Sequence, residues 1–124
     1  MHRSRLAGFI MDCQGQNPAD AARFWSQAFG MPVWGEDGPT YVGLDASARD
    51  LTVEVQRVDH PSRVHVDIEA DDIEAEVKRL EALGARRVEK IKTWWVLEAP
   101  TGQRFCVVRA KVDLSKAAGA TAWE

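Results

Sequence analysis

Hydrophobic and polar residues alternate strictly in the stretch "VHVDIEADD", residues 64–72. Alternation with a period of two is typical of a β-strand, where neighbouring side chains point to opposite faces of the sheet. The apolar side chains would share one face, and the opposite face would carry His65, Asp67 and Glu69. That polar face is either solvent-exposed surface or the lining of a pocket that uses an imidazole and a carboxylate.

A helical period replaces the alternation in two stretches, and the first of them has clear signals at both ends. Asn17 is expected to cap this helix, Pro18 to occupy its first turn and Gly30 to end it. The spacing of the apolar residues predicts a buried stripe, which consists of Phe24, Trp25, Ala28 and Phe29.

The second helix directly follows the alternating strand. Asp71 is expected to cap it, with Glu74 as the partner in a capping box, and Gly84 is expected to end it. Its predicted buried stripe consists of Ile73, Val77, Leu80 and Leu83.

The remaining apolar segments predict strands, and together with the helices they give the order β-α-β-β-β twice. The helix stops Gly30 and Gly84, like the strand centres Gly8 and His65, lie at similar offsets in the two halves. Each helix would cover one face of its sheet and leave the other face free to form a trough. The expected strands span residues 5–13, 32–36, 40–44, 51–58, 63–69, 85–91, 93–99 and 104–110.

The length predicts one domain over residues 1–110, built from modules at about 5–58 and 63–109. A tail over residues 111–124 carries no strong period and is expected either to dock weakly or to fray.

The charge balance narrows the class of partner. A net charge of -3 argues against nucleic acid, which is bound through clustered Lys and Arg. No apolar stretch is long enough for a membrane span or a signal peptide, so a cytoplasmic location is expected. The two cysteines, Cys13 and Cys106, match no paired metal spacing and are expected to be free, buried thiols.

Three blocks, "ARFWSQAFGM", "VHVDIEADDIEAEVKRLEALGA" and "WWVLEAPTGQRFCVV", occur in an order that resembles the vicinal oxygen chelate superfamily. This superfamily includes the glyoxalase and bleomycin-resistance fold. The resemblance covers residues 5–110. It implies an α+β fold in which two βαβββ modules form a cup-shaped mixed sheet with the helices on its outer face. It also implies a homodimer.

Metal-dependent members of the superfamily carry one ligand on the first and one on the last strand of each module. Carried over to this sequence, those positions are Gly8, Glu54 (or Gln56 on the same face), His65 and Cys106. Only Glu54 and His65 resemble ligands. Asp12 has the parity of Gly8 but lies near the end of its strand, and Ala99 replaces the acidic residue of the family's usual turn. No cofactor is therefore expected, with a divalent metal as the alternative.

Several side chains are expected to line the cup, and each also has a plainer reading. His65 and Glu54 are the candidates for a catalytic role. His65 could instead be a structural histidine held by Asp67 or a neighbouring backbone carbonyl, and Glu54 could lie on solvated strand surface. Asp67 could bind a ligand or form an ion pair with an arginine such as Arg57. Cys106 is more readily explained as an inert buried thiol. The complete expected ligand-binding set is Trp34, Tyr41, Glu54, Gln56, His65, Asp67, Trp94, Trp95 and Cys106.

Five tryptophans are many for this length, and aromatic walls suit a planar organic ligand. Of the neighbours Trp94 and Trp95, one must pack under a helix while the other faces the cup. The first functional hypothesis is a glyoxalase-like protein that sequesters or recognises a small aromatic or apolar molecule. The second is a metal-dependent lyase, isomerase or dioxygenase. The third is an interaction module whose cup is filled by its own side chains.

Overall fold

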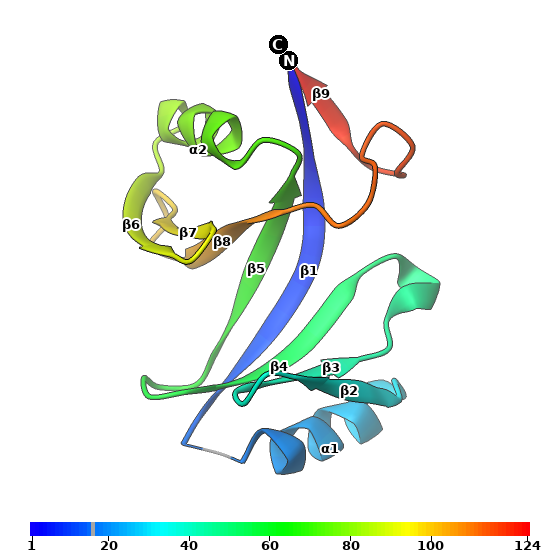
Figure 1. The fold of residues 1–124 in the computed structure, drawn as a ribbon. Coiled ribbons are helices and arrows are strands. Elements are labelled where there is room, and N and C mark those ends of the chain that lie inside the picture. Colours follow the sequence, from blue (N-terminus) through cyan, green and yellow to red (C-terminus); the bar gives the residue numbers. More distant parts are fainter. Residues whose placement is uncertain (16) are drawn as a thin grey trace. The chain divides into compact units, whose positions relative to one another are not determined.

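The computed structural model describes residues 1–15 and 17–124; Gln16, expected in the first loop, lies outside the described residues. The described chain forms strands, two α-helices and one short 3-10 helix (Figure 1). The helices are α1 (Pro18–Phe29), η1 (Ser47–Arg49) and α2 (Ile73–Ala82). The strands are β1 (His2–Gln14), β2 (Val33–Asp37), β3 (Tyr41–Leu44), β4 (Thr52–Val58), β5 (Arg63–Ala70), β6 (Arg86–Ile91), β7 (Trp94–Glu98), β8 (Arg104–Arg109) and β9 (Thr121–Trp123).

The element order confirms the predicted β-α-β-β-β pattern in both halves, and the fold is α+β with an open, mixed sheet. In each half the first and last strands pair in parallel, β1 with β4 and β5 with β8, while the other neighbours are antiparallel. A parallel pair needs a crossover connection, and a helix begins the connection each time. The cup that both halves are expected to form together stays a prediction.

The chain divides into two compact units that do not coincide with the two predicted modules. Unit 2 comprises Gly8–His65, and unit 1 comprises Met1–Ala7 together with Val66–Glu124. Strands β1 and β5 each run from one unit into the other because the division falls within them. Each unit has its own helix and core.

Unit 2 contains the strand order β2-β3-β4-β1, and α1 covers one face of these strands (Figure 1). Successive side chains of a strand point to opposite faces, so every second residue of each strand faces α1. Its core consists of Met11, Cys13, Ala22, Val42, Leu44, Ala46, Val53 and Val55.

Helix α1 begins and ends as the sequence predicts, but its buried stripe is different. The Asn17 side chain accepts a hydrogen bond from the Ala19 amide, and Gly30 has the left-handed φ of 68°. Phe24, Ala28 and Phe29 are exposed, so the predicted stripe is wrong at these positions. The helix approaches the sheet through the small Ala22 instead, and Trp25 lies beside this contact.

Unit 1 contains the order β5-β8-β7-β6, with α2 beside these strands. Val66 and Ile68 of β5 pack against its core, which confirms their predicted face, whereas Val64 is exposed. The buried residues of this core are Ala70, Val77, Leu80, Leu97, Phe105 and Val107.

The predicted stop of α2 is confirmed, since Gly84 follows its C-cap residue with a φ of 109°, but the predicted cap and one stripe position need correction. Asp72 caps this helix by accepting from the Ala75 amide. The Asp71 carboxylate accepts from the Arg3 amide instead, because Asp71 follows β5 beside the start of β1. Leu83 is exposed because it follows the last helical turn, so the predicted stripe is wrong there.

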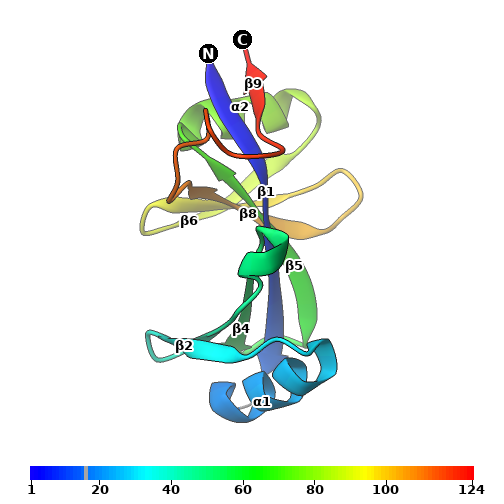
Figure 2. The ribbon, with the colours of Figure 1, turned by 90° about the vertical axis from the view of Figure 1, so that its right-hand side faces the viewer.

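The terminal segment is docked rather than frayed. Strand β9, red in Figure 2, pairs antiparallel with the start of β1, with Trp123 opposite His2. The indole of Trp123 donates to the Ser4 hydroxyl at 2.9 Å and stacks on the guanidinium of Arg79 at 3.8 Å. A hydrophobic period could not predict this docking, because it depends on the single side chain of Trp123.

A fully buried carboxylate lies next to this strand pair. Glu76 receives two hydrogen bonds of 2.8 Å from Arg79 and faces Nε2 of His2, also at 2.8 Å. Burial, the largest single influence, raises the pKa of Glu76. The hydrogen bonds from Arg79, His2 and Ser4 together outweigh it, so the pKa lies below 4.5.

The two cysteines are buried and free, as predicted. Burial raises the pKa of the Cys13 thiol, so this sulfur remains protonated at neutral pH. Among the described residues, no helix has the length and apolar character that a membrane span requires.

Candidate functional site

The face of unit 2 that points away from α1 gathers most of the predicted site. Since Val42, Val53 and Val55 pack under α1, their strand neighbours point to the opposite face. The strand register places Gln56 between Asp12 and Tyr41, and Glu54 between Ile10 and Gly43. This surface, which we call the open face, also receives His65, and it carries Ile10, Asp12, Tyr41, Gly43, Glu54 and Gln56.

Asp12 and His65 form the most specific contact of the open face. Oδ2 of Asp12 lies 2.9 Å from Nδ1 of His65, and a carboxylate can only accept, so Nδ1 donates. The Asp12 side chain is 1% exposed and the His65 side chain 13%. In the neutral ring this bond fixes the tautomer that has its lone pair at Nε2. On the polar side of β5, the His65 side chain is therefore largely buried and paired with Asp12.

Two further basic side chains approach the same carboxylate. Nε of Arg63 lies 3.5 Å and Nε2 of His60 3.9 Å from Oδ2 of Asp12. Oδ1 of Asp12 is also buried, and within the described chain it has no hydrogen-bond partner. A buried carboxylate is stable only with such compensation. Asp12 therefore anchors the start of β5 to β1.

Aromatic side chains form the outer part of the open face. The indole of Trp34, on β2, lies over Gly43 so closely that a Cβ on Gly43 would be 2.5 Å from its Nε1. Trp34 is 75% exposed although it rests on the sheet. Tyr41 is partly buried beside Gln56. Trp34 and Tyr41, two of the residues predicted to form an aromatic wall, therefore lie on the same face.

The other predicted residues lie in unit 1. Asp67 of β5 pairs in register with Cys106 of β8, on the side away from α2. Trp95 packs in the core under α2, with Arg87 over its ring at 4.9 Å. Trp94 has the opposite parity, as the sequence analysis expects for one member of this pair. The proposed ion pair between Asp67 and Arg57 would join the two units and stays a prediction.

Two residues of the open face had no role in the sequence analysis. Asp12 was noted only for its position near the strand end, although it is the single polar side chain within the otherwise apolar residues 6–13. That isolation is a usable signal, because a lone carboxylate in a buried strand needs a partner. Gly43 gave no signal, since its role as a seat for Trp34 depends on the pairing of β2 with β3.

The superfamily's metal positions fit this chain poorly. Gly8 has no side chain, and a Cβ there would overlap the carbonyl oxygen of Thr52, so no ligand fits at this position without moving the backbone. Cys106 is buried opposite Asp67. Glu54 and His65 remain, whereas catalytic metals usually have three protein ligands. The chain's own residues therefore do not reproduce the complete ligand set.

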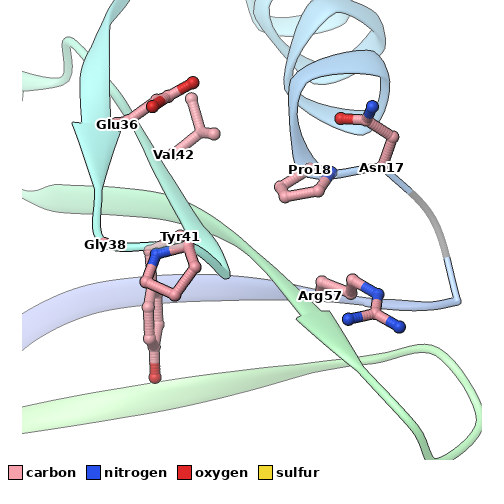
Figure 3. A pocket seen from close by; sticks show the side chains of 8 residues that line it. Asn17, Pro18, Glu36, Gly38, Tyr41, Val42 and Arg57 are labelled. Atoms are coloured by element: carbon pink, nitrogen blue, oxygen red, sulfur yellow. The ribbon is translucent and has the colours of Figure 1, made fainter.

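A separate cavity of about 410 Å³ lies at the start of α1, on the helix side of the sheet (Figure 3). Arg57 and Pro18 line one side and Glu36 the other, whereas the ring of Tyr41 points away from Val42. The amides of Asp20 and Ala21 donate to the Asn17 carbonyl, and Pro18 has no N–H, so this end of the helix offers few donors. The predicted ligand-binding residues, Tyr41 excepted, lie elsewhere.

Comparison with known proteins identifies the family. The family model described as "Glyoxalase-like domain" matches residues 8–108. The chain therefore belongs to the glyoxalase-like domain family, in agreement with the family resemblance of its motifs. The comparison with curated proteins gave no match.

Solved structures support the same fold at low sequence identity. Methylmalonyl-CoA epimerase from Mycobacterium tuberculosis is 13% identical with a TM-score of 0.67, covering 91% of this chain and 92% of that one. A hypothetical protein from Bacillus halodurans has the same identity and TM-score, with 89% and 96% covered. The Mn(II)-bound glyoxalase from Novosphingobium aromaticivorans is 18% identical with a TM-score of 0.60, but this chain covers only 44% of it, against 91% of its own length.

Proposed function

We propose that the protein binds a small aromatic or apolar molecule on the open face of unit 2 and acts by sequestering or recognising it. The observation that supports this most is Trp34, a tryptophan 75% exposed and yet seated on a glycine of the sheet. Large exposed aromatic side chains beside polar groups are typical of ligand sites. The ring provides a flat surface for a planar ligand.

The polar side chains of the same face would orient that ligand. Glu54, Gln56 and His65 provide carboxylate, amide and imidazole groups, and Asp12 holds the imidazole in one orientation. Small-molecule sites commonly combine apolar walls with a few such polar groups. A planar ligand with one hydroxyl group would suit this combination.

Replacing Trp34 by alanine is expected to weaken binding of 2-naphthol, a neutral planar probe, about tenfold, because the stacking surface is lost. Ligand fluorescence titration and NMR shifts measure this. Leu83→Ala is the matched control, since Leu83 is 67% exposed but lies in unit 1. Equal affinity in the Trp34 variant, or no binding by the unmodified protein, would exclude the proposal.

A metal-dependent lyase, isomerase or dioxygenase is the second candidate, and the Asp12–His65 hydrogen bond favours it. Metal-bound histidines commonly donate their other ring N–H to a carboxylate, as Nδ1 of His65 does here. One solved structure with this fold is a Mn(II)-bound glyoxalase.

Metal analysis of protein purified without chelator separates the two candidates. The binding proposal predicts a metal content well below one ion per chain, unchanged in His65→Ala. A full complement of metal that is lost in His65→Ala, but kept in the control His60→Ala, would instead establish the metal-dependent candidate.

We also propose that the protein forms a homodimer and acts in the cytoplasm. Support for the dimer is the exposed sheet edge that β2 and β6 provide at the ends of the strand order, which a second subunit can cover. Light scattering on the purified protein tests the dimer.

A further inference from the structure

A second cavity of unit 2 lies beside α1, at the border between the α1 side of the sheet and the open face, and measures about 460 Å³. This volume falls within the range of small-molecule sites. The residues around it come from β1, α1 and the segment 62–64, and they are Met11, Asp12, Cys13, Asp20, Ala21, Phe24, Trp25, Ser62, Arg63 and Val64.

Apolar side chains form most of the wall of this cavity. Phe24 and Trp25 meet edge to face, with ring centroids 5.0 Å apart, and Met11 and Ala21 lie beside them. Phe24 is 61% exposed and Val64 54%. Large apolar side chains that face solvent within a concave surface favour an apolar ligand. A ligand in this cavity would cover Phe24, which explains why this residue of the predicted buried stripe is exposed.

Arg63 supplies the positive charge at this cavity. Its side chain is 47% exposed, and its Nε faces Asp12 at 3.5 Å, which is longer than a normal hydrogen bond. The other four N–H groups of the guanidinium have no partner within the described residues, so they can donate to a carboxylate. The hydroxyl of Ser62 accepts from the Gln14 amide and can donate its own proton.

The acidic groups at the cavity are either paired or buried. Asp20 forms an ion pair with Arg23 at 3.0 Å, and the Asp12 side chain is only 1% exposed. Cys13 adds no negative charge, because its thiol remains protonated. Arg63, whose side chain is 47% exposed, is therefore the charged group that remains available to a ligand.

We propose that this cavity is a second binding site, which takes a small organic anion with an aromatic body and a carboxylate. The ring would lie against Phe24, Trp25 and Val64, and the carboxylate would accept from Arg63 and Ser62. Its apolar wall is separate from the open face, and the two sites share only Asp12.

Two matched probes test the site: 2-naphthoate, and its neutral analogue 2-naphthylmethanol. The protein is expected to bind 2-naphthoate at least tenfold more tightly than the analogue, and Arg63→Gln is expected to abolish this preference. Arg49→Gln, on the exposed η1, is the control and should keep it. Equal affinities for both probes in the unmodified protein, or a preference that survives Arg63→Gln, would overturn the proposal.

NMR locates the bound probe and guards against a variant that does not fold. In the unmodified protein, 2-naphthoate is expected to shift the signals of Met11, Ala21, Trp25 and Val64 and to leave the Trp34 indole unchanged. Shifts confined to Trp34, or no shifts at a probe concentration of about 10 mM, would exclude the site. The Trp34→Ala variant should bind 2-naphthoate normally, so failure of the open-face proposal can be told apart from failure here.

Discussion

Replacement of Glu76 by glutamine is expected to lower the free energy of unfolding by about 3–5 kcal/mol, since the change breaks a buried ion pair and leaves a charge uncompensated. Arg79 would lose its bidentate acceptor, and His2 would face an amide. Denaturant unfolding measures the change. Glu81→Gln, which removes an exposed carboxylate from the same helix, should cost less than about 1 kcal/mol.

The loss should depend on pH in a defined direction. The pKa of Glu76 in the folded protein lies below 4.5, its ordinary value. A lowered pKa adds stability that is complete above pH 4.5 and is lost as the pH falls through the folded-state pKa. The stability difference between the two proteins should therefore be constant near neutrality and shrink below pH 4.5. A difference that grows on acidification would contradict the assigned charge state.

Replacement of Gly8 by alanine is the second change with a large expected effect. The new Cβ would overlap the carbonyl oxygen of Thr52 on the neighbouring strand β4, and only a shift of the backbone can relieve this. Overpacking of this kind costs about 1–3 kcal/mol, and a clash with backbone lies at the upper end. Thermal and denaturant unfolding measure the cost.

The matched control is Gly43→Ala, in which the added Cβ meets a side chain instead. The indole of Trp34 is 75% exposed and can move away, so stability should change by less than about 1 kcal/mol. Binding of 2-naphthol should weaken nevertheless, since the ring loses its seat. If both alanines cost the same stability, the distinction between backbone and side-chain contacts would be wrong.

Local patterns predicted most of the fold. Asn17 and Gly30 delimit α1 as expected because capping and a left-handed stop are properties of single residues. The cap of α2 was placed one residue early because Asp71 and Asp72 are equally suited to this role in sequence. Only the distant Arg3 amide, which binds the Asp71 carboxylate, distinguishes them.

For the candidate site, the sequence could predict which face of its own strand each side chain occupies, but not which strands lie side by side. Alternation placed Glu54, Gln56 and His65 on one polar side of their strands, and the register confirms a shared face for the first two. The partner of His65 was not predictable, because Asp12 lies 53 residues away in sequence. Whether the open face joins a cup with unit 1 stays a prediction.

Because β9 pairs with the start of β1, unit 1 contains both ends of the chain. Unit 1 takes strands from residues 2–7 and 121–123 as well as from its central segment, so no continuous fragment reproduces it. A truncated chain that begins at residue 66 would retain Glu76 and Arg79 but lack His2 and Ser4. Such a fragment would expose an unsatisfied strand edge, and aggregation during expression is the outcome to expect.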